Sequence, residues 1–205
     1  MNYETVTVQQ MRDYDKYTID NFCPSKTLMM RAAQGIYDNV DWKGKKTAII
    51  CGSGNNGGDG YALSVLIKKS GENVSLVRLG DKFSDDGKYY YDMAMSCGVE
   101  DILFVKDFET DKYDILVDCI LGTGFTGEVR GNARLAIQKI NQASSYVVSA
   151  DINSGMNGDT GEAQLAVKSD ITVSIGFYKA GMVKDIAKKY IGKLVNVDIG
   201  IVRPE

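Results

Sequence analysis

The chain has 205 residues, 44% of them hydrophobic, and its 24 basic side chains nearly balance its 27 acidic ones. This charge gives no basic surface for nucleic acid or for an anionic membrane, so neither is expected as a partner. The complete absence of histidine excludes Ser-His-Asp and Cys-His triads and leaves acid–base chemistry to Asp, Glu, Lys, Tyr or Cys.

The length fits one domain with one substantial core. The sequence has no run of about 20 apolar residues that could span a bilayer, and its start lacks the basic and apolar regions of a signal peptide. We therefore expect a soluble, cytoplasmic protein. The four cysteines form no C-x-x-C pair, and Cys51 and Cys119, at the ends of apolar runs, are expected to be buried thiols.

Two amphipathic helices are predicted at the start of the chain, before any strand. Thr7-Val8-Gln9-Gln10 matches the T-x-x-Q capping box, and apolar residues at helical spacing predict a helix over residues 8–21. Pro24-Ser25 interrupts this pattern, and a second apolar stripe predicts a helix that ends near Asp41. The methionines of these stripes could form a partner surface, but packing against the main body is the favoured interpretation.

From residue 46 onward, short apolar runs alternate with helical segments. Strands are predicted at 47–51, 74–79, 115–118, 146–150, 171–175 and 194–197. Helices are predicted at about 59–70, 85–97 and 132–143, the first closed by Gly71 and the second capped by Ser84. This alternation predicts parallel strands joined by right-handed crossovers, which is a doubly wound α/β sandwich.

Ligands of such folds bind beyond the carboxyl ends of the strands. The loop after the first of these strands, residues 52–60, contains G-x-G-x-x-G at Gly52, Gly54 and Gly57, a pattern typical of dinucleotide-binding turns. Asp59 complicates this interpretation, because a carboxylate at the helix start would repel a pyrophosphate. A tight turn with a capping Asp is the alternative.

Two further loops each follow an acid at the end of a buried strand, Asp118 or Asp151. Buried carboxylates are costly unless they are paired, hydrogen-bonded or bound to a cation. Together with Asn56, Ser154 and loop carbonyls they form a candidate all-oxygen site for a hard monovalent or divalent cation. In the alternative, each Asp only accepts amide bonds in its own turn. Lys179 follows another strand and is either functional or simply solvated.

Five motifs follow one another along the chain: N-N-G-G-D-G at 55–60, V-D-x-x-L-G-T-G at 117–124, D-I-x-S-G at 151–155, G-D-T-G at 158–161 and F-x-K-x-G at 177–181. In this order they resemble the NAD(P)HX epimerases, the YjeF N-terminal domain family. The resemblance covers nearly the whole chain. It implies a Rossmann-like three-layer α/β sandwich with a mostly parallel central sheet, two leading helices and a single domain over residues 1–205, without a fused dehydratase domain.

The resemblance also implies a function. Members of this family interconvert the R and S forms of hydrated NADH and NADPH (NADHX and NADPHX) at carbon 6 of the nicotinamide ring. A separate ATP- or ADP-dependent NAD(P)HX dehydratase would then restore the S form to NAD(P)H. A homodimer with one potassium ion (K+) per subunit is expected on the same basis.

The resemblance assigns site residues by position. It predicts potassium ligands at Asn56, Asp118 and Ser154. Asp151 and Lys179 are the candidate acid–base pair, since a partly desolvated aspartate is a suitable base in a chain without histidine. The expected substrate contacts are Asn55, Asn56, Gly57, Gly58, Asp59, Gly122, Thr123, Gly124, Phe125, Thr126, Gly127, Glu128 and Asp151.

The chain departs from the family pattern at two positions. Asn153 replaces the usual proline of D-I-P-S-G, so the rigid turn is lost, although asparagine tolerates turn geometry. Met30 replaces the glutamate that usually follows Leu-Met, which removes an expected support between helix and loop.

Two other functions fit parts of the sequence. An NAD(P)-dependent oxidoreductase is indicated by G-x-G-x-x-G and by Asp81, which lies just beyond the second strand, where a ribose-binding acid would be. A non-catalytic binding or interaction module is the other alternative. The presence of Asp118, Asp151 and Lys179 argues against such a module.

Overall fold

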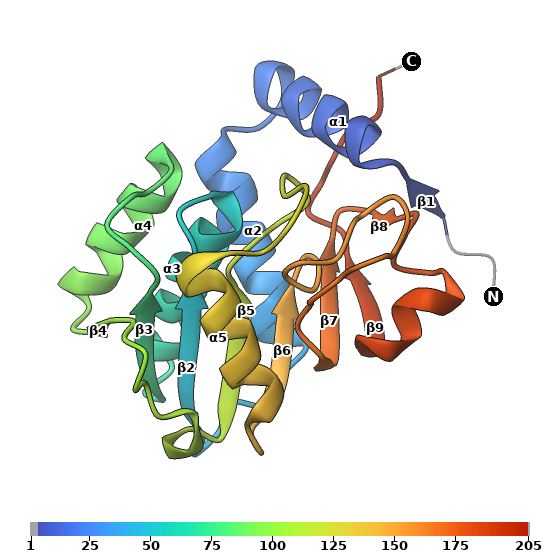
Figure 1. Ribbon diagram of the computed structural model, residues 1–205. Helices are drawn as coiled ribbons and strands as arrows, with labels where there is room; N and C mark the ends of the chain where they lie inside the picture. The colour runs from blue at the N-terminus through green and yellow to red at the C-terminus, as the bar shows by residue number, and fades with distance from the viewer. Residues whose placement is uncertain (1–3, 205) are drawn as a thin grey trace.

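A seven-stranded parallel sheet forms the centre of the computed structural model, which describes residues 4–204 (Figure 1). The spatial order of its strands is β4-β3-β2-β5-β6-β7-β9. The chain therefore changes direction across the sheet after β4, and the topological switch point lies between β2 and β5, where ligands of such folds bind. The strands are β2 (Lys46–Cys51), β3 (Asn73–Arg78), β4 (Glu100–Leu103), β5 (Ile115–Cys119), β6 (Tyr146–Ala150), β7 (Ser169–Ile175) and β9 (Ile191–Val197).

Helices cover both faces of this sheet, which confirms the predicted α/β sandwich. On one face, α2 (Ser25–Asp38), α3 (Asn55–Lys69) and α4 (Asp85–Ser96) pack together, and α5 (Gly131–Gln142) covers the other. The side chains of β2 alternate accordingly: Ile49 packs into the core below α2 and α3, and Ile50 into the core below α5. A sheet buried on both faces requires the apolar strands that the sequence contains.

The helix α1 (Val8–Asn21) has the predicted bounds and the predicted capping box at Thr7. It lies over the carboxyl ends of the strands rather than on a face of the sheet (Figure 1). A short strand, β1 (Thr5–Val6), precedes it and pairs in parallel with β8 (Tyr178–Lys179). The prediction that no strand precedes the two helices is therefore wrong, because a two-residue strand carries no detectable hydrophobic period.

Other boundaries also differ from the prediction. The helix α3 begins at Asn55, four residues before the predicted start, so Asp59 lies in its second turn and is not a cap. The strand β4 was not predicted, since this edge strand is only half-buried and shows no alternation. The strand β9 begins at Ile191 rather than 194, and α2 ends at Asp38. The short helices η1 (Thr110–Lys112) and η2 (Asp185–Lys189) complete the described chain.

The predicted burial of several residues is confirmed. Cys51 and Cys119 are free and buried, and Met29 of α2 belongs to the main core. The apolar stripe is less covered at the end of α1, because Ile19 and Phe22, the residue that follows the helix, are 41% and 61% exposed. Within residues 4–204 no helix combines the length and the hydrophobicity that a membrane span requires.

Candidate active site

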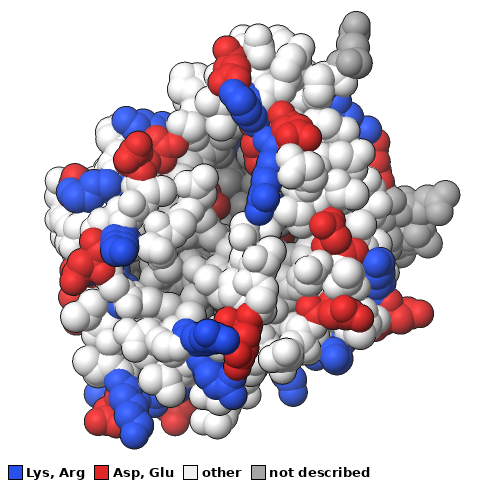
Figure 2. Space-filling model, turned by 45° about the horizontal axis from the view of Figure 1, so that its top comes forward, with Lys and Arg blue, Asp and Glu red and all other residues white. Residues whose placement is uncertain are grey.

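A cavity of about 910 Å³ opens at the carboxyl ends of the strands. Its walls come from α1, α2, the start of α3 and the loops after β2, β3 and β5, together with Asp151 and Lys179. Figure 2 shows this face of the molecule hollowed near its centre, with charges of both signs around the hollow. The volume lies within the range of pockets that enclose small molecules and cofactors.

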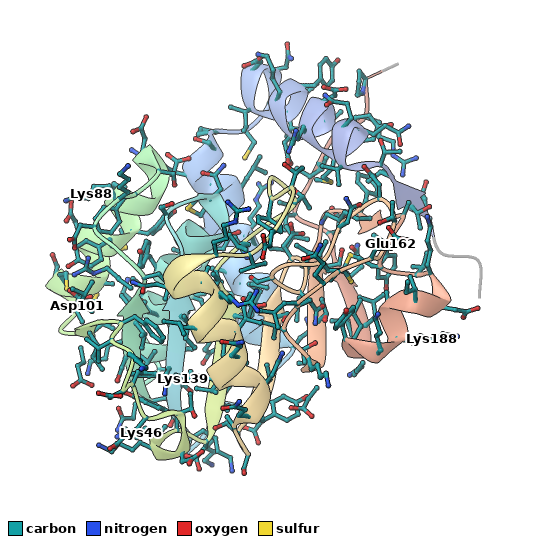
Figure 3. All side chains as sticks on the ribbon, in the orientation of Figure 1. Lys46, Lys88, Asp101, Lys139, Glu162 and Lys188 are labelled. Atoms are coloured by element: carbon teal, nitrogen blue, oxygen red, sulfur yellow. The ribbon has the colours of Figure 1, made fainter. Side chains whose placement is uncertain are left out.

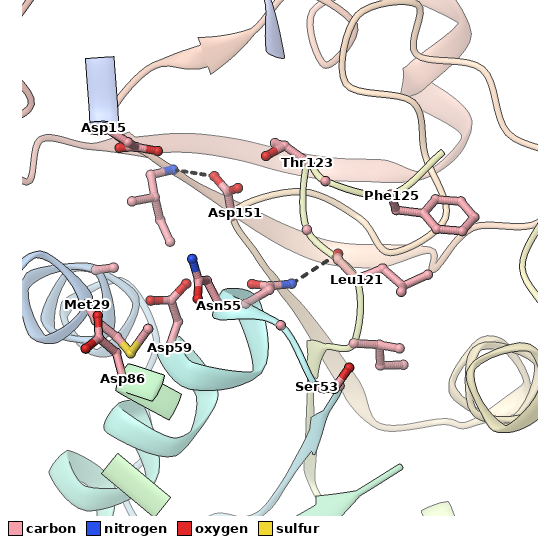
Figure 4. Close-up of a pocket in the computed structure, with 18 of the residues that line it drawn as sticks. Asp15, Met29, Ser53, Asn55, Asp59, Asp86, Leu121, Thr123, Phe125 and Asp151 are labelled. Carbon is pink, nitrogen blue, oxygen red and sulfur yellow. Dashed lines mark hydrogen bonds between the residues drawn. The ribbon is translucent and has the colours of Figure 1, made fainter. Parts of the chain in front are cut away.

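Asp151 and Lys179 form an ion pair at the wall of the cavity (Figure 4). The ammonium group of Lys179 donates to Asp151 Oδ1 and to the carbonyl of Ile175 at 2.9 Å. Lys179 is only 1% exposed, whereas the Asp151 side chain retains 17% exposure. Asp151 has a φ of +64°, a left-handed conformation that is uncommon outside glycine and typical of strained functional positions. The structure thus brings together the two residues predicted as the acid–base pair.

The backbone fixes the positions of both side chains. The amide of Asp151 donates to the carbonyl of Val173 at 2.8 Å, and Oδ1 accepts the amide of Ile175 at 3.2 Å. Lys179 belongs to β8, which β1 holds in register through the pair Val6–Lys179. Two neighbouring strand ends and the N-terminal strand therefore determine where the pair lies.

Two more carboxylates, those of Asp15 and Asp59, line the cavity near this pair (Figure 4). Burial, together with the negative charge of Asp151, raises the pKa of Asp15 to about 6, while Lys179 opposes the shift. Burial also raises the pKa of Asp59 well above its usual range, with further contributions from Asp151 and Asp15. Three carboxyl groups thus surround one ammonium group at this wall of the cavity.

Asp15 was not predicted from the sequence as a site residue. A signal was present, because Met11, Asp15 and Thr18 follow the i, i+4, i+7 spacing of one helix face, and Met11 and Thr18 are the buried residues of α1. An acid within the buried stripe of an amphipathic helix indicates a polar partner or a site.

Asp118 is fully buried in β5 and is not part of the cavity wall. Its carboxylate accepts bonds from the amides of Ile120 (3.2 Å) and Ser154 (2.8 Å) and from the hydroxyls of Ser149 (3.0 Å) and Ser154 (2.5 Å). Burial outweighs these bonds and raises the pKa of Asp118 to about 6. The side chain thus ties its own turn to the loop after β6.

An unpaired oxygen lies next to this network. Asn56 donates through Nδ2 to the carbonyl of Leu121 at 3.1 Å, but its buried Oδ1 has no hydrogen-bond partner among the described residues. Ser154 Oγ accepts the amide of the same Leu121 at 2.7 Å. A buried acceptor without a partner costs roughly 1–3 kcal/mol, and a hard cation is a ligand that would satisfy it.

The oxygen atoms available in this region suit a monovalent cation. Asn56 and Ser154 offer neutral oxygens, and Asp118 offers a single carboxylate. Within residues 4–204, no group of three or more His, Cys, Asp or Glu side chains is placed to hold a metal ion. The residues present therefore fit potassium better than zinc or another Lewis-acid metal.

Comparison with known proteins identifies the family. The model of the YjeF-related protein N-terminus matches residues 25–181. The chain belongs to this YjeF-related family. A Lentilactobacillus buchneri protein named NAD(P)H-hydrate epimerase is 36% identical, and the match covers 98% of this chain and 96% of that protein. An Oenococcus oeni protein of the same name is 31% identical, with 97% and 98% covered.

A solved structure has the same fold as this chain. The crystal structure of yeast ynu0 superposes with a TM-score of 0.78 over 94% of this chain and 87% of the yeast chain. The two sequences are 18% identical, so this likeness bears on the fold alone.

The substrate-binding and acid–base residues predicted from the YjeF-related motifs fall into four places. Those that line the cavity are Asn55, Asn56, Asp59, Gly122, Thr123, Gly124, Phe125, Asp151 and Lys179. Gly57 and Gly58 are buried in α3, where a Cβ would overlap the carbonyl of Gly52 or the side chain of Met29. Thr126 and Gly127 line a separate cavity of about 400 Å³, and Glu128 pairs with Arg130 at 3.1 Å. The substrate contacts expected of all these residues stay predictions.

Proposed function

We propose that this chain is an NAD(P)H-hydrate epimerase that interconverts the R and S forms of NADHX and NADPHX. The observation that carries the proposal is the Asp151–Lys179 ion pair, which faces a cavity built from the glycine-rich loops of a YjeF-related fold. The names and near-complete coverage of the curated relatives support the same activity. The glycine-rich turn before α3 supplies backbone amides for the diphosphate of a dinucleotide.

Epimerisation at carbon 6 of the hydrated ring needs no net oxidation and no net change in protons. When water is lost, the departing hydroxyl takes up a proton, and when water returns to the other face, it gives a proton back. A ring-opening route likewise requires one proton to be removed and returned. A single carboxyl group that alternately donates and accepts a proton can serve either route.

In this proposal Asp151 exchanges that proton with the substrate. Lys179 holds the carboxylate of Asp151 through the ion pair and polarises the bound ring through its ammonium charge. Because Lys179 is almost fully buried, its charge is poorly screened by water and acts strongly on groups in the cavity. Asn55, Asp59 and the loop from Gly122 to Phe125 contact the substrate and keep bulk water from the reacting carbon.

We further propose one potassium ion per subunit, held by Asn56, Asp118 and Ser154. The unpaired Oδ1 of Asn56 supports this assignment. When bound, the ion supplies positive charge that fixes the loops after β2, β5 and β6 relative to one another. Asn56 lies in the first turn of α3, Asp118 in β5 and Ser154 in the loop after β6, so the ion would join three separate segments at the edge of the cavity.

The proposed setting is cytoplasmic, with the chain acting as a single-domain homodimer. Epimerisation alone only equilibrates the two hydrates, so a separate ATP- or ADP-dependent dehydratase must consume the S form for repair to be complete. The family resemblance supports both the homodimer and this division of labour.

The experiment that tests the function starts from separated R- and S-NADHX. Purified protein is added to each epimer, with and without potassium, and the stereochemical purity is followed by chromatography. We expect both samples to converge on the same mixture, and faster with potassium present. If each epimer stays pure at stoichiometric protein with potassium present, the proposed function is wrong.

A further inference from the structure

The cavity extends beyond the proposed catalytic pair to the loop after β3. Its wall there includes Leu79, Gly80, Asp81 and Lys82. The side chain of Asp81 is 82% exposed, so it is open to a ligand. The proposed epimerisation assigns no role to this end of the cavity.

The guanidinium of Arg78, at the end of β3, is already engaged by protein groups. It donates through Nε and Nη2 to the two oxygens of Asp101 at 2.7 and 2.9 Å. Nη1 donates to Asp81 at 2.7 Å and to the carbonyl of Gly80 at 3.1 Å. Figure 3 labels Asp101 on β4, at the edge of the sheet. Arg78 therefore fixes the conformation of the loop and has little capacity left for a phosphate.

Aromatic rings further restrain the arginine. Its guanidinium carbon lies 5.3 Å from the ring centre of Tyr91 and 5.8 Å from that of Phe83. Tyr91 also donates to Asp101 at 2.9 Å. An arginine held by two carboxylates and two rings does not turn toward a new anion without losing these contacts.

The charge at this end of the cavity is unfavourable for an additional phosphate. The carboxylates of Asp81, Asp86 and Asp101 outnumber the cations of Arg78 and Lys82. A phosphate monoester carries roughly two negative charges at neutral pH. Lys82 is exposed and alone cannot offset both the added charge and the neighbouring acids.

The sheet order indicates which part of a dinucleotide reaches this loop. The strand β2 carries the glycine-rich turn and β3 lies beside it. In folds with this strand order, the acid after the second strand binds the adenosine ribose, while the diphosphate lies at the glycine-rich turn. Asp151 follows β6, on the other side of β2 and beyond β5, and Lys179 is paired with it. The reacting ring would then be at this end of the cavity.

We infer that Asp81 accepts a hydrogen bond from the 2′-hydroxyl of the adenosine ribose and repels a 2′-phosphate, so that this chain prefers NADHX to NADPHX. The inference rests on the proposed function and adds the identity of the preferred substrate. Arg78 acts as a positioning residue, because it orients Asp81 and does not itself contact the ligand.

The test compares kcat/KM for R-NADHX and R-NADPHX in the wild type and in Asp81→Asn. We expect the wild type to favour NADHX by about tenfold or more, and the variant to lose most of this ratio, as expected for one charged contact. The change should appear in KM for both substrates, with kcat for NADHX unchanged. Asp85→Asn removes the same charge from an exposed position outside the cavity wall and should leave the ratio unaltered.

A binding measurement separates this inference from the proposed function. Titration calorimetry with ADP-ribose and with its 2′-phosphate uses ligands that undergo no epimerisation. Tighter binding of ADP-ribose by a protein without epimerase activity would support the inference and refute the function. Equal kcat/KM for the two hydrates, or a ratio that Asp81→Asn leaves unchanged, would overturn the inference while the function stands.

Discussion

Lys179 and Asp151 are 28 residues apart in the chain, yet the ammonium of one contacts the carboxylate of the other at the edge of the same cavity. The contact depends on a residue in left-handed conformation at the end of β6 and on a lysine held by β1. A buried ammonium is tolerated only when it is paired and hydrogen-bonded. The pair proposed for acid–base chemistry is therefore also a structural requirement of this region.

Replacing Asp151 by asparagine separates these two roles. The substitution leaves the buried ammonium without its charge partner, so the free energy of unfolding should fall by about 3–5 kcal/mol. Epimer exchange should fall by about 10²–10⁴-fold, the usual contribution of a proton-transfer group. Urea denaturation and chiral chromatography measure the two effects.

The double variant Asp151→Asn/Lys179→Met is the control for stability. It removes the unpaired charge, so much of the lost stability should return while activity stays absent. Asp20→Asn, on the exposed side of α1, should change neither quantity. Full activity in Asp151→Asn would exclude this residue as the proton-transfer group.

Much of the fold was predictable because its signals are local. The bounds of α1 follow from a capping box and a 3.6-residue period, both readable from consecutive residues. The strands β2, β5 and β6 are continuous apolar runs between turns. The start of α3 was not predictable in this way, because Asn-Asn-Gly-Gly has low helix propensity and becomes helical only through close packing against the neighbouring turn and α2.

The same difference between local sequence signals and long-range packing applies to the site residues. Asp151, Lys179 and Asn56 were identified because each belongs to a motif at a strand end. Asp15 could not be identified in this way, because it lines the cavity only through the position of α1 over the strand ends. No local sequence pattern indicates that a helix will pack there and not on a face of the sheet. The pairing of β1 with β8 is likewise a contact between the two ends of the chain.

Asp15 should give the protein a measurable pH dependence of stability. Its folded pKa of about 6 lies above the ordinary value of 3.8, so the folded state binds this proton more tightly than the unfolded state. The associated stability is present below about pH 4 and is lost as the pH rises through about 6. Asp15→Asn should flatten that part of the profile and be more stable than the wild type by about 1–2 kcal/mol at pH 7.5.

The groups that face Asp15 are Asp151, Asp59 and Lys179. Denaturation midpoints measured between pH 4 and 8 test the expectation. Asp13→Asn serves as the matched control, since Asp13 lies on the same helix but is exposed. A profile that Asp15→Asn leaves as steep as that of the wild type would show that Asp15 is not the titrating group.

Potassium should stabilise the protein through the oxygen of Asn56. A ligand that binds only the folded state at 100 times its Kd adds about 2.7 kcal/mol. We therefore expect a higher Tm in potassium chloride than in tetramethylammonium chloride at equal ionic strength. Asn56→Leu and Ser154→Ala should abolish the difference.

The neighbouring Asn55 provides the control for the cation site. It lines the cavity but is exposed and belongs to no buried oxygen set, so Asn55→Ala should keep the potassium effect on Tm. Equal Tm values in the two salts for the wild type would speak against a bound cation, and an effect that persists in Asn56→Leu would assign the ion to other ligands.

Asn153, at the position where the family resemblance implies a proline, has a hydrogen-bonded side chain. It is fully buried, and Nδ2 donates to the carbonyls of Val167 and Tyr190, both at 3.0 Å, and to Ser169 Oγ at 2.9 Å. Oδ1 accepts the hydroxyl of Thr172 at 2.7 Å. The amide thus ties the loop after β6 to β7 and to the segment that leads into β9.

Asn153→Pro should therefore destabilise this protein, although the family resemblance implies proline at this position. The substitution leaves several buried polar groups without partners, and the expected loss is about 2–4 kcal/mol in the free energy of unfolding. Adding Thr172→Val removes one of these groups and should restore part of the loss, whereas Thr172→Val alone should be destabilising. If Asn153→Pro proves as stable as the wild type in urea, the turn geometry and not the side-chain network holds this loop.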